Sequence, residues 1–251
     1  MIERGLLVRH EPVVRNLIVV RRTSLSPGLV RITLGGDELD GFTSLGAADH
    51  VKAVFSEDIR RDFTPRAFRP RVGGAAPELD IDFYLHGDGI ASTWAAAARE
   101  GDPVTIGGPR GSRLAPEGAS RVILGADESA LPAFARWIEL LPDAVEILGF
   151  VELDNPSDAA YLDPDHVHKA RVVWLDKADG ALERAIRALG SIGDDTFVWI
   201  AGEATSLIPI RRYLRRELGL PTAQVAIDGY WKRGEAGRNH HAPIDPDDPE
   251  D

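Results

Sequence analysis

Cysteine is absent from this chain of 251 residues. Its absence excludes disulfides, thiolate zinc sites and cysteine-ligated iron–sulfur clusters. Positive charge is also scarce, because 29 lysines and arginines stand against 40 aspartates and glutamates, which gives a net charge of −11. A general nucleic-acid binder needs a basic surface to displace counterions, so we expect no nucleic-acid partner.

Long hydrophobic runs are missing as well. No stretch approaches the roughly 18 apolar residues that a membrane-spanning helix needs. The first residues, MIERGLLVRHEPVVRN, carry charges among their apolar side chains and lack the apolar core of a signal peptide. We therefore expect a cytoplasmic protein without membrane association, and we expect a monomer.

The first half of the chain has the pattern of a small antiparallel barrel. Short runs of β-branched or alternating residues are divided by clusters of Pro, Gly and Asp. The runs are residues 13–22, 28–36, 50–55, 61–68, 79–87 and 102–111, with a short helix near 91–100. The sequence therefore predicts a six-stranded barrel.

After residue 117 the pattern changes to continuous apolar strands that alternate with amphipathic helices. The strands are 121–127, 145–153, 171–175 and 196–203, and the longest helix covers 204–219. This alternation is typical of a parallel sheet covered by helices on both faces. We predict two domains, 1–117 and 118–237, followed by an acidic, proline-rich segment, 238–251, that we expect to be disordered.

The stretch RDFTPRAF, residues 61–68, carries two arginines that an ordinary barrel strand does not need. Arg61 and Arg66 offer forked donors that suit phosphate oxygens. Thr64 can donate to the edge of a flat ring, and Phe63 can pack on a ring or a ribose. A barrel followed by an α/β nucleotide-binding domain is one way to hold a flavin against a nicotinamide. From these residues alone, an exposed strand with solvated arginines is an equal alternative.

A glycine-rich turn, LHGDGIAS, follows about 20 residues later. Gly87 and Gly89 let the backbone come close to a ligand. The helix that begins at Ala91 and Ser92 would direct its free N–H groups at a phosphate. The alternative is a turn in which the glycines serve the backbone geometry alone.

Six blocks, in order between residues 13 and 236, resemble the siderophore-interacting protein family. These proteins are flavin-dependent ferric-siderophore reductases related to the ferredoxin–NADP reductase superfamily. The blocks are RDFTPR, LDIDFYLHGDGIASTWA, GDPVTIGGPRG, ADESALPAFARWIELLP, WIAGEATSLIPIRRYLRRELG and DGYWKRGEA. The resemblance implies an FAD-binding barrel followed by an NAD(P)H-binding α/β domain, with electrons passing through FAD to a ferric siderophore.

Two other functions remain open alongside this one. The chain could be a flavin or quinone reductase whose iron reduction is incidental, or a siderophore-binding carrier that retains flavin without turnover.

The resemblance also implies which residues bind the cofactors. In the barrel these are Arg61, Phe63, Thr64, Arg66, His86, Gly87, Ala91 and Ser92. In the α/β domain they are Asp127, Glu128, Ser129, Gly202, Glu203, Tyr230 and Trp231. Thr64 and Trp231 are expected beside the reacting rings, as catalytic residues.

Three residues depart from the family pattern. Phe63 replaces the commoner tyrosine, which removes a phenolic hydrogen bond and keeps the ring. Ile90 replaces a proline, so the turn before the helix is less rigid, and Ser129 is a milder change from threonine.

Several of these positions also have structural explanations. Asp127, between a strand and a helix, can be an N-cap. Gly202 can simply end a strand, and Tyr230 and Trp231 can be core aromatics. Because ligands bind at the carboxyl ends of strands in open α/β sheets, the positions of Asp127, Gly202 and Glu203 favour a site.

An anionic ferric chelate needs local cations on this acidic protein. Lys52, Lys232 and Arg233 are the candidates for substrate binding. We expect no protein metal site. His240 and His241, beside the tail that we expect to be disordered, should be solvated, and so should His166 and His168.

The nicotinamide is not fixed by the sequence. Glu152 could bind a ribose hydroxyl and repel a 2′-phosphate, whereas Lys177, Arg211 or Arg212 could do the opposite. We expect a slight preference for NADH.

Overall fold

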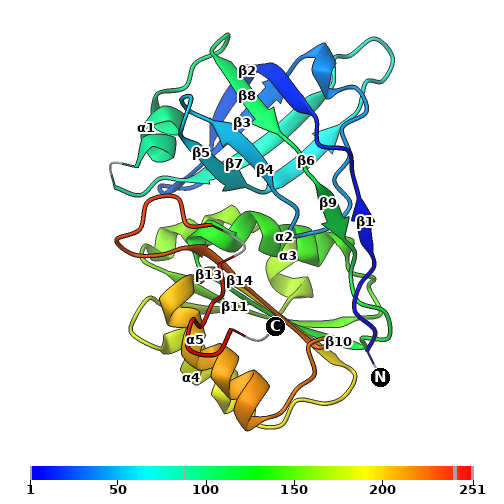
Figure 1. Cartoon of the computed structure of the whole chain (residues 1–251), viewed down its shortest axis with the longest axis vertical. Coiled ribbons are helices and arrows are strands. Elements are labelled where there is room, and N and C mark those ends of the chain that lie inside the picture. The colour runs from blue at the N-terminus through cyan, green and yellow to red at the C-terminus, as the bar shows by residue number, and fades with distance from the viewer. Residues whose placement is uncertain (1, 88, 240–241, 250–251) are drawn as a thin grey trace. The chain divides into compact units, whose positions relative to one another are not determined.

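The computed structural model describes residues 2–87, 89–239 and 242–249. The chain divides into two units, Leu7–Leu114 and the combination of Met1–Leu6 with Ala115–Asp251 (Figure 1). No helix among the described residues is long and apolar enough to cross a membrane. The expected boundary at residue 117 and the observed division both fall between the strands β9 (Gly111–Arg113) and β10 (Arg121–Ala126).

The first unit is a curled antiparallel sheet of seven strands in the order β5-β4-β8-β2-β3-β7-β6. Its strands are β2 (Val14–Ser24), β3 (Leu29–Gly35), β4 (Val51–Val54), β5 (Arg60–Phe63), β6 (Pro65–Arg69), β7 (Glu78–Tyr84) and β8 (Pro103–Gly107). A short 3-10 helix, η1 (Asp37–Leu39), follows β3, and β1 (Leu7–Arg9) pairs separately with β9.

The predicted count of six barrel strands is corrected to seven, because RDFTPRAF forms two strands. β5 is one edge of the sheet and β6 is the other edge, and Thr64 alone separates them. The chain itself therefore joins the two edges of the curled sheet. Pro65 has no N–H to continue the first ladder, and the β6–β7 pairing shifts register between Pro65 and Ala67.

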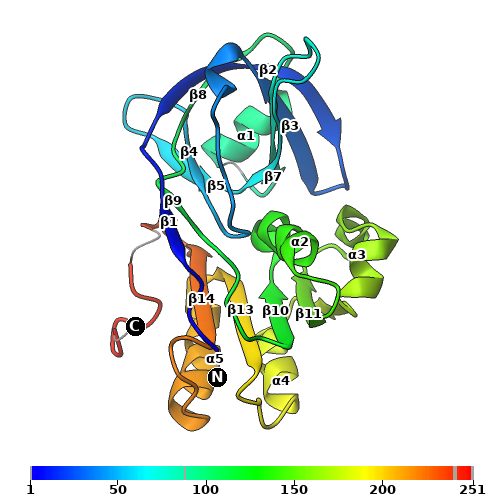
Figure 2. The same ribbon diagram turned by 90° about the vertical axis from the view of Figure 1, so that its right-hand side faces the viewer.

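Apolar side chains on alternate strand positions fill the inside of the curl. Val19, Ile32, Ile81 and Ile106 are among the buried members of this core. The helix α1 (Ile90–Ala97) packs on the same core through Trp94, and Figure 2 shows this helix inside the curl of strands.

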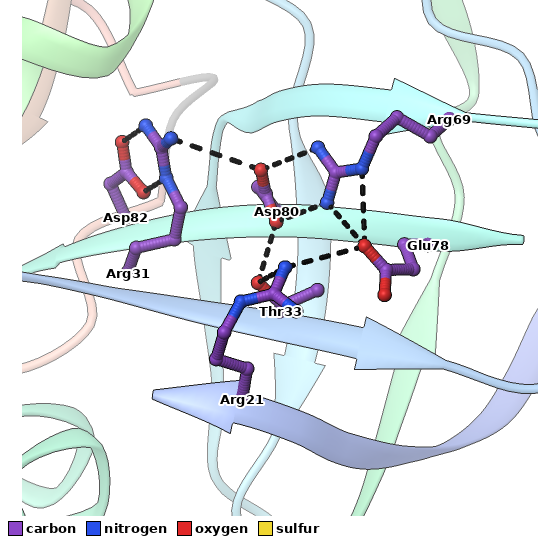
Figure 3. Close-up of polar contacts among 7 residues, drawn as sticks. All are labelled: Arg21, Arg31, Thr33, Arg69, Glu78, Asp80 and Asp82. Atoms are coloured by element: carbon purple, nitrogen blue, oxygen red, sulfur yellow. Dashed lines mark hydrogen bonds and ion pairs between the residues drawn. The ribbon is translucent and has the colours of Figure 1, made fainter. Parts of the chain in front are cut away.

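The outer face of β3, β6 and β7 carries an ionic network (Figure 3). Asp80 accepts bonds from the Arg69 guanidinium at 2.7 and 2.8 Å and from the Thr33 hydroxyl at 2.8 Å. Asp82 accepts two bonds from Arg31 at 2.7 and 2.8 Å. Both carboxylates are buried, so these arginines supply the charge and the hydrogen bonds that burial requires.

The second unit is a parallel sheet of five strands in the order β12-β11-β10-β13-β14. Besides β10, the strands are β11 (Glu146–Leu153), β12 (Val173–Asp176), β13 (Thr196–Glu203) and β14 (Val225–Trp231). The helices are η2 (Glu128–Ala130), α2 (Leu131–Leu140), η3 (Pro156–Tyr161), α3 (Pro164–Lys169), α4 (Ala181–Ala188), α5 (Ala204–Arg212) and the π-helical turn η4 (Tyr213–Glu217).

Helices cover both faces of this sheet, as the alternating pattern predicts. On one face, Trp137 of α2 packs against Phe197 and Trp199 of β13, with ring centroids 5.7 and 6.0 Å apart. On the other face, α4 and α5 bury Leu182 and Ile210 in a second core (Figure 2). The sequence prediction missed one parallel strand, β14, which contains the Gly-Tyr-Trp block.

The described part of the acidic tail, residues 242–249, is packed, whereas the sequence favoured disorder. Ile244 is buried in the α4–α5 core. Asp245 pairs with Arg212 at 2.5 Å, and Asp248 pairs with Arg211 at 2.9 Å. The tail is ordered here because α5 supplies arginines for its aspartates, and composition alone did not reveal that pairing.

Candidate functional site

Four of the residues predicted to bind flavin, Arg61, Phe63, Thr64 and Arg66, lie on the seam of the barrel, defined here as residues 60–66. Phe63 pairs with Val51 across the β5–β4 ladder, and Arg61 pairs with Ala53. Val51 and Ala53 are buried in the core, and directly paired residues point to the same face of an antiparallel sheet. Arg61 and Phe63 therefore lie on the inner face.

The polar groups of the seam differ in their surroundings. The guanidinium of Arg61 donates to the carbonyl oxygen of Arg60 at 2.8 Å, and it has no acidic partner in the part of the chain that the structure describes. Thr64 is buried, and its hydroxyl has no hydrogen-bond partner among the described residues. The register shift places Arg66 outside the regular pairing, as β-bulges do where a side chain is redirected.

An aromatic cluster connects the seam to α1. Phe63 packs against Phe83, with ring centroids 4.3 Å apart, and against Phe55 at 6.3 Å. Trp94 of α1 lies 5.6 Å from both Phe55 and Phe83. The cluster thus brings together the arginine-bearing seam and the helix that follows the glycine-rich turn.

The N-terminus of α1 has the features of an anion site. Gly89 is the N-cap, no side chain of the described residues caps the helix, and no acidic residue occupies its first turn. The Ser92 hydroxyl accepts a bond from the His86 N–H at 3.2 Å and donates to the Tyr84 carbonyl at 3.3 Å. Ser92 therefore fixes the turn, and the first-turn N–H groups, including that of Ala91, point out of the helix end.

These residues fit FAD. Two guanidiniums and a helix N-terminus can hold a pyrophosphate, while Thr64 can meet the edge of the flavin ring. Gly87 has a φ of 51°, and a Cβ there would meet nothing within 4 Å, so the turn leaves open space beside the helix end. FAD, when bound, would supply the capacity to accept a hydride and release single electrons.

Lys52, a predicted substrate-binding residue of the barrel, already has an acidic partner. Its ammonium group donates to both carboxylate oxygens of Asp62, at 2.7 and 2.9 Å. The two residues are directly paired on β4 and β5 and alternate with the core residues, so they lie on the outer face. A substrate anion would compete with Asp62 for this lysine.

The α/β unit has a pocket of about 130 Å³ at the carboxyl ends of its central strands. The order β11-β10-β13 places the reversal of strand order beside it, which is where open α/β sheets bind nucleotides. Its charged lining residues are Asp127, Glu152, Asp154, Asp179, Glu183, Glu203, Lys177 and Arg233. Six carboxylates against two cations make the pocket acidic.

Asp127 is buried, with 4% exposure, and four donors from the chain surround its carboxylate. One oxygen accepts from the Ser129 N–H at 2.9 Å and from the Ser129 hydroxyl. The other accepts from the Glu203 N–H at 3.0 Å and from the Trp231 indole at 2.7 Å. Asp127 is therefore the N-cap of η2 and a bridge between strand ends, and both of its carboxylate oxygens already accept hydrogen bonds from the chain.

Glu128 is fully buried, with 0% exposure, and holds Lys177. The lysine donates to Glu128 at 2.8 Å and to Asp154 at 3.3 Å. Burial lowers the pKa of Lys177, but the charge of Asp127 and the bond to Glu128 outweigh it, so the pKa lies above its ordinary value. Lys177 is therefore a permanent cation on the pocket wall.

Glu203 is the N-cap of α5, with its carboxylate accepting from the Ser206 N–H at 2.7 Å and from the Arg233 N–H at 3.1 Å. Burial acts to raise its pKa, and these bonds overcome that effect and lower it. Lys232, next to Arg233, lies 3.4 Å from Glu235. Two of the three predicted substrate cations, Lys52 and Lys232, thus have an acidic neighbour.

The residues weighed for nicotinamide selectivity are also engaged. Glu152 accepts from the Leu182 N–H at 2.7 Å, and burial raises its pKa. Arg211 is 2% exposed and, with Arg212, is paired with the acidic tail. Of the three cations weighed for nicotinamide selectivity, Lys177, Arg211 and Arg212, Lys177 alone lines the described pocket.

Tyr230 and Trp231 occupy an irregular part of β14. Gly202 pairs with Gly229, and Glu203 pairs with Trp231, so Tyr230 is an extra residue on its strand. Trp231 lines the pocket and Lys177 lies 5.5 Å from the centre of its ring.

Among the pocket residues that the sequence prediction missed, Asp154 and Asp179 had a signal. Asp154 directly follows β11, and Asp179 lies three residues after the end of β12. Polar residues just past parallel strands are candidates for the carboxyl-end crevice.

His166 and His168 do not line this pocket. The ring nitrogens of His166 lie 3.0 Å from Glu139 and 2.8 Å from Asp163, and His168 lies on the same helix, α3. His240 and His241 lie outside the described residues.

A curled antiparallel sheet followed by a parallel α/β unit confirms the predicted class, a ferredoxin reductase-like flavoprotein fold. The family model described as siderophore-interacting FAD-binding domain matches residues 18–60 and 56–113. The model described as siderophore-interacting protein matches residues 119–234. The chain belongs to the siderophore-interacting protein family.

Individual relatives cover nearly the whole chain. The NADPH-dependent ferric-chelate reductase of Escherichia coli is 32% identical over 89% of this chain and 95% of its own length. The ferric vibriobactin reductase ViuB of Vibrio cholerae is 29% identical over 90% of this chain and 92% of its own length. The crystal structure of a siderophore utilization protein from T. fusca has a TM-score of 0.83 and 34% identity, and covers 94% of this chain and 99% of that one.

Proposed function

We propose that the protein is an FAD-dependent ferric-siderophore reductase, which moves electrons from NAD(P)H through flavin to a ferric siderophore in the cytoplasm. One observation carries the proposal. The aromatic cluster of Phe55, Phe63, Phe83 and Trp94 connects the seam of the barrel to the uncapped N-terminus of α1. Relatives named as ferric-chelate and ferric vibriobactin reductases support the same activity.

The chain's residues have distinct tasks in this reaction. Arg61, Arg66 and the first turn of α1 bind the pyrophosphate, and Thr64 donates to the ring edge. The acidic pocket of the α/β unit receives the nicotinamide dinucleotide. Reduction of the iron weakens its binding by the hard oxygen donors of a siderophore, which favours transfer of the metal to softer acceptors. The siderophore's iron is substrate here and needs no protein ligand.

The proposal includes a preference for NADH over NADPH. The pocket is lined by six carboxylates and two cations, so an added 2′-phosphate meets repulsion from its walls. The charge of Lys177 is already balanced by Glu128 at 2.8 Å. Burial raises the pKa of Glu152, and its side-chain oxygens can accept a hydrogen bond from a ribose hydroxyl.

An anaerobic reduction assay tests the function. The purified protein, loaded with FAD, is mixed with NADH or NADPH, and bleaching of the flavin absorption is followed. The reduced protein is then mixed with a ferric siderophore, a quinone or oxygen, and the reoxidation rates are compared. We expect bleaching by a nicotinamide, faster with NADH, and the fastest reoxidation by the ferric siderophore.

Each other outcome identifies a different function. Binding of FAD and siderophore without reduction by either nicotinamide indicates a carrier. Faster reoxidation by quinone than by the ferric siderophore indicates a quinone reductase. A folded protein that binds no flavin contradicts the proposal altogether.

A further inference from the structure

Three strand ends of the α/β unit meet at one carboxylate. Asp127 follows β10 and receives hydrogen bonds from the Glu203 N–H at the end of β13 and from the Trp231 indole at the end of β14, at 3.0 and 2.7 Å. Ser129 supplies two more donors from η2. Because all four donors belong to the chain, this carboxylate fixes the geometry of the pocket wall.

The bulge in β14 determines which side chain reaches Asp127. In a regular ladder the residue after Gly229 would stand opposite Glu203. Instead Trp231 pairs with Glu203 and Tyr230 is the extra residue. A shift of one residue exchanges the two faces of a strand, so the bulge puts Trp231 where a regular strand would put Tyr230.

Gly202 makes room for this arrangement. Its φ is 155°, and a Cβ at this position would lie 2.8 Å from the Asp127 carboxyl carbon. Any larger residue would displace the carboxylate from the two strand ends that it joins. Gly202, Asp127 and the bulge therefore act together to place Trp231.

Resting on the proposed function, we propose that Asp127 is a positioning residue that acts through Trp231. Asp127 does not touch the nicotinamide dinucleotide. It holds the Trp231 indole against the pocket, and Trp231 is the wall on which the dinucleotide packs. Lys177, 5.5 Å from the centre of the indole ring, faces this wall and is held in place by the buried Glu128.

An aspartate is required for this task because both of its oxygens accept. An asparagine would present an amide NH₂ either to the Ser129 donors or to the Glu203 and Trp231 donors. The Ser129 hydroxyl can turn to accept from such an amide, but the Ser129 N–H, the Glu203 N–H and the Trp231 indole cannot, so at least one buried donor is left opposite another donor.

The test compares Asp127→Asn, Trp231→Phe and the double variant in the FAD-loaded protein. Phe keeps an aromatic ring and removes the indole N–H, and Trp174→Phe in β12 is the matched control, since Trp174 does not line the pocket. Anaerobic stopped-flow reduction at increasing NADH separates the dissociation constant of NADH from the limiting rate. Tryptophan emission is recorded for each variant without NADH.

We expect Asp127→Asn and Trp231→Phe each to raise the dissociation constant about tenfold, the effect of one hydrogen bond to a charged group. The double variant should be no weaker than Asp127→Asn alone, because residues that act as a unit are not additive. Trp174→Phe should leave NADH binding unchanged. The emission of Trp231 is the difference between the spectra of the protein with and without Trp231→Phe. This difference spectrum should change when Asp127 is replaced by asparagine.

Several results would overturn the inference. Additive effects in the double variant, or a Trp231 emission that ignores the change at Asp127, exclude action through Trp231. If Asp127→Asn does not fold, Trp231→Phe alone decides, and NADH binding equal to that of Trp174→Phe refutes the idea. If the unaltered protein fails to react with any nicotinamide, the proposed function falls, while the emission comparison still tests the link between Asp127 and Trp231.

Discussion

Three carboxylates of the α/β pocket, where we propose that the nicotinamide dinucleotide binds, are hydrogen-bonded to the chain. Glu203 caps α5, Glu152 accepts from the start of α4, and Asp127 joins three strand ends. A sequence motif identifies such residues, but it does not distinguish a structural role from ligand binding. At the residue scale, the role depends on which donors surround each carboxylate.

Arg61→Gln tests the flavin role of the seam. Loss of one charge-assisted hydrogen bond should weaken FAD binding about tenfold or more. Arg60→Gln is the matched control, because it removes the same charge from the adjacent, exposed arginine. Equilibrium dialysis or fluorescence titration with FAD measures both. Equal losses in the two variants would show that general charge, and not the seam geometry, determines the affinity.

Glu152→Gln should stabilise the folded chain near neutral pH, because it removes a carboxylate whose ionised form burial disfavours. Burial raises the pKa of Glu152, so the ionised form is penalised in the folded state when the pH lies above the folded pKa. As pH falls through that pKa and then below the unfolded pKa, the glutamate is neutral in both states and the advantage of glutamine disappears. Urea denaturation near pH 7 and near pH 4 measures the difference, which should be small in acid. A constant difference at both pH values would contradict the prediction.

At the scale of elements, the outer-face network fastens β6 to its neighbour. Arg69 of β6 binds Asp80 of β7 at 2.7 Å, and the same strand carries Arg66. Burial raises the pKa of Asp80, but its bonds to Arg69 and Thr33 overcome this and lower it. The network therefore supports the seam from the opposite face of the sheet.

Asp80→Asn should lower the free energy of unfolding by about 2 to 3 kcal/mol, less than the roughly 3 to 5 kcal/mol for breaking a fully buried pair, because Arg69 is partly exposed. The folded pKa lies below the unfolded value of about 3.9, so the carboxylate stabilises fully above that value and its contribution is lost as pH falls through the folded pKa. Denaturation curves across the acid range should show that the variant loses part of this pH dependence. If the unfolding free energy of the variant depends on acid pH as strongly as that of the unaltered protein, other carboxylates cause this dependence.

Ion pairs also join the acidic tail, residues 242–249, to α5. Asp245→Asn with Asp248→Asn should lower the melting temperature, and high salt should reduce the deficit only slightly, because Asp245 and Arg211 are buried and buried pairs are screened little. Hydrogen bonds from Arg212 lower the pKa of Asp245, so the contribution is present at neutral pH and is lost in strong acid. Asp247→Asn is the control, since that carboxylate is 92% exposed and 3.9 Å from Arg212. An equal loss in the control would exclude specific pairing.

For the whole molecule, the net charge of −11 governs which chelates approach readily. Raising the ionic strength should increase the rate of reduction of an anionic ferric chelate several-fold, because salt screens repulsion between like charges. A neutral hydroxamate chelate should react at a rate that salt does not change. Stopped-flow reoxidation of the reduced protein at several salt concentrations measures both. A rate that falls with salt for the anionic chelate would show that a local cationic surface at Lys232 and Arg233 outweighs the net charge.

The sequence by itself determined the order of the two units and the family. Alternating runs before residue 117 and continuous apolar runs after it follow from how strands bury one face or two, which is a local property. The sequence also marked Arg61, Thr64, Asp127 and Trp231.

Only the tertiary structure decided what those residues contact. Thr64 joins the two edges of the curled sheet because β5 and β6 pair with different strands. Asp127 meets Trp231, 104 positions away, because parallel strands end at one edge of the sheet and a bulge shifts β14 by one residue. The tail is packed because its aspartates meet the arginines of α5. Such contacts join residues far apart in the chain, and hydrophobic periodicity carries no information about them.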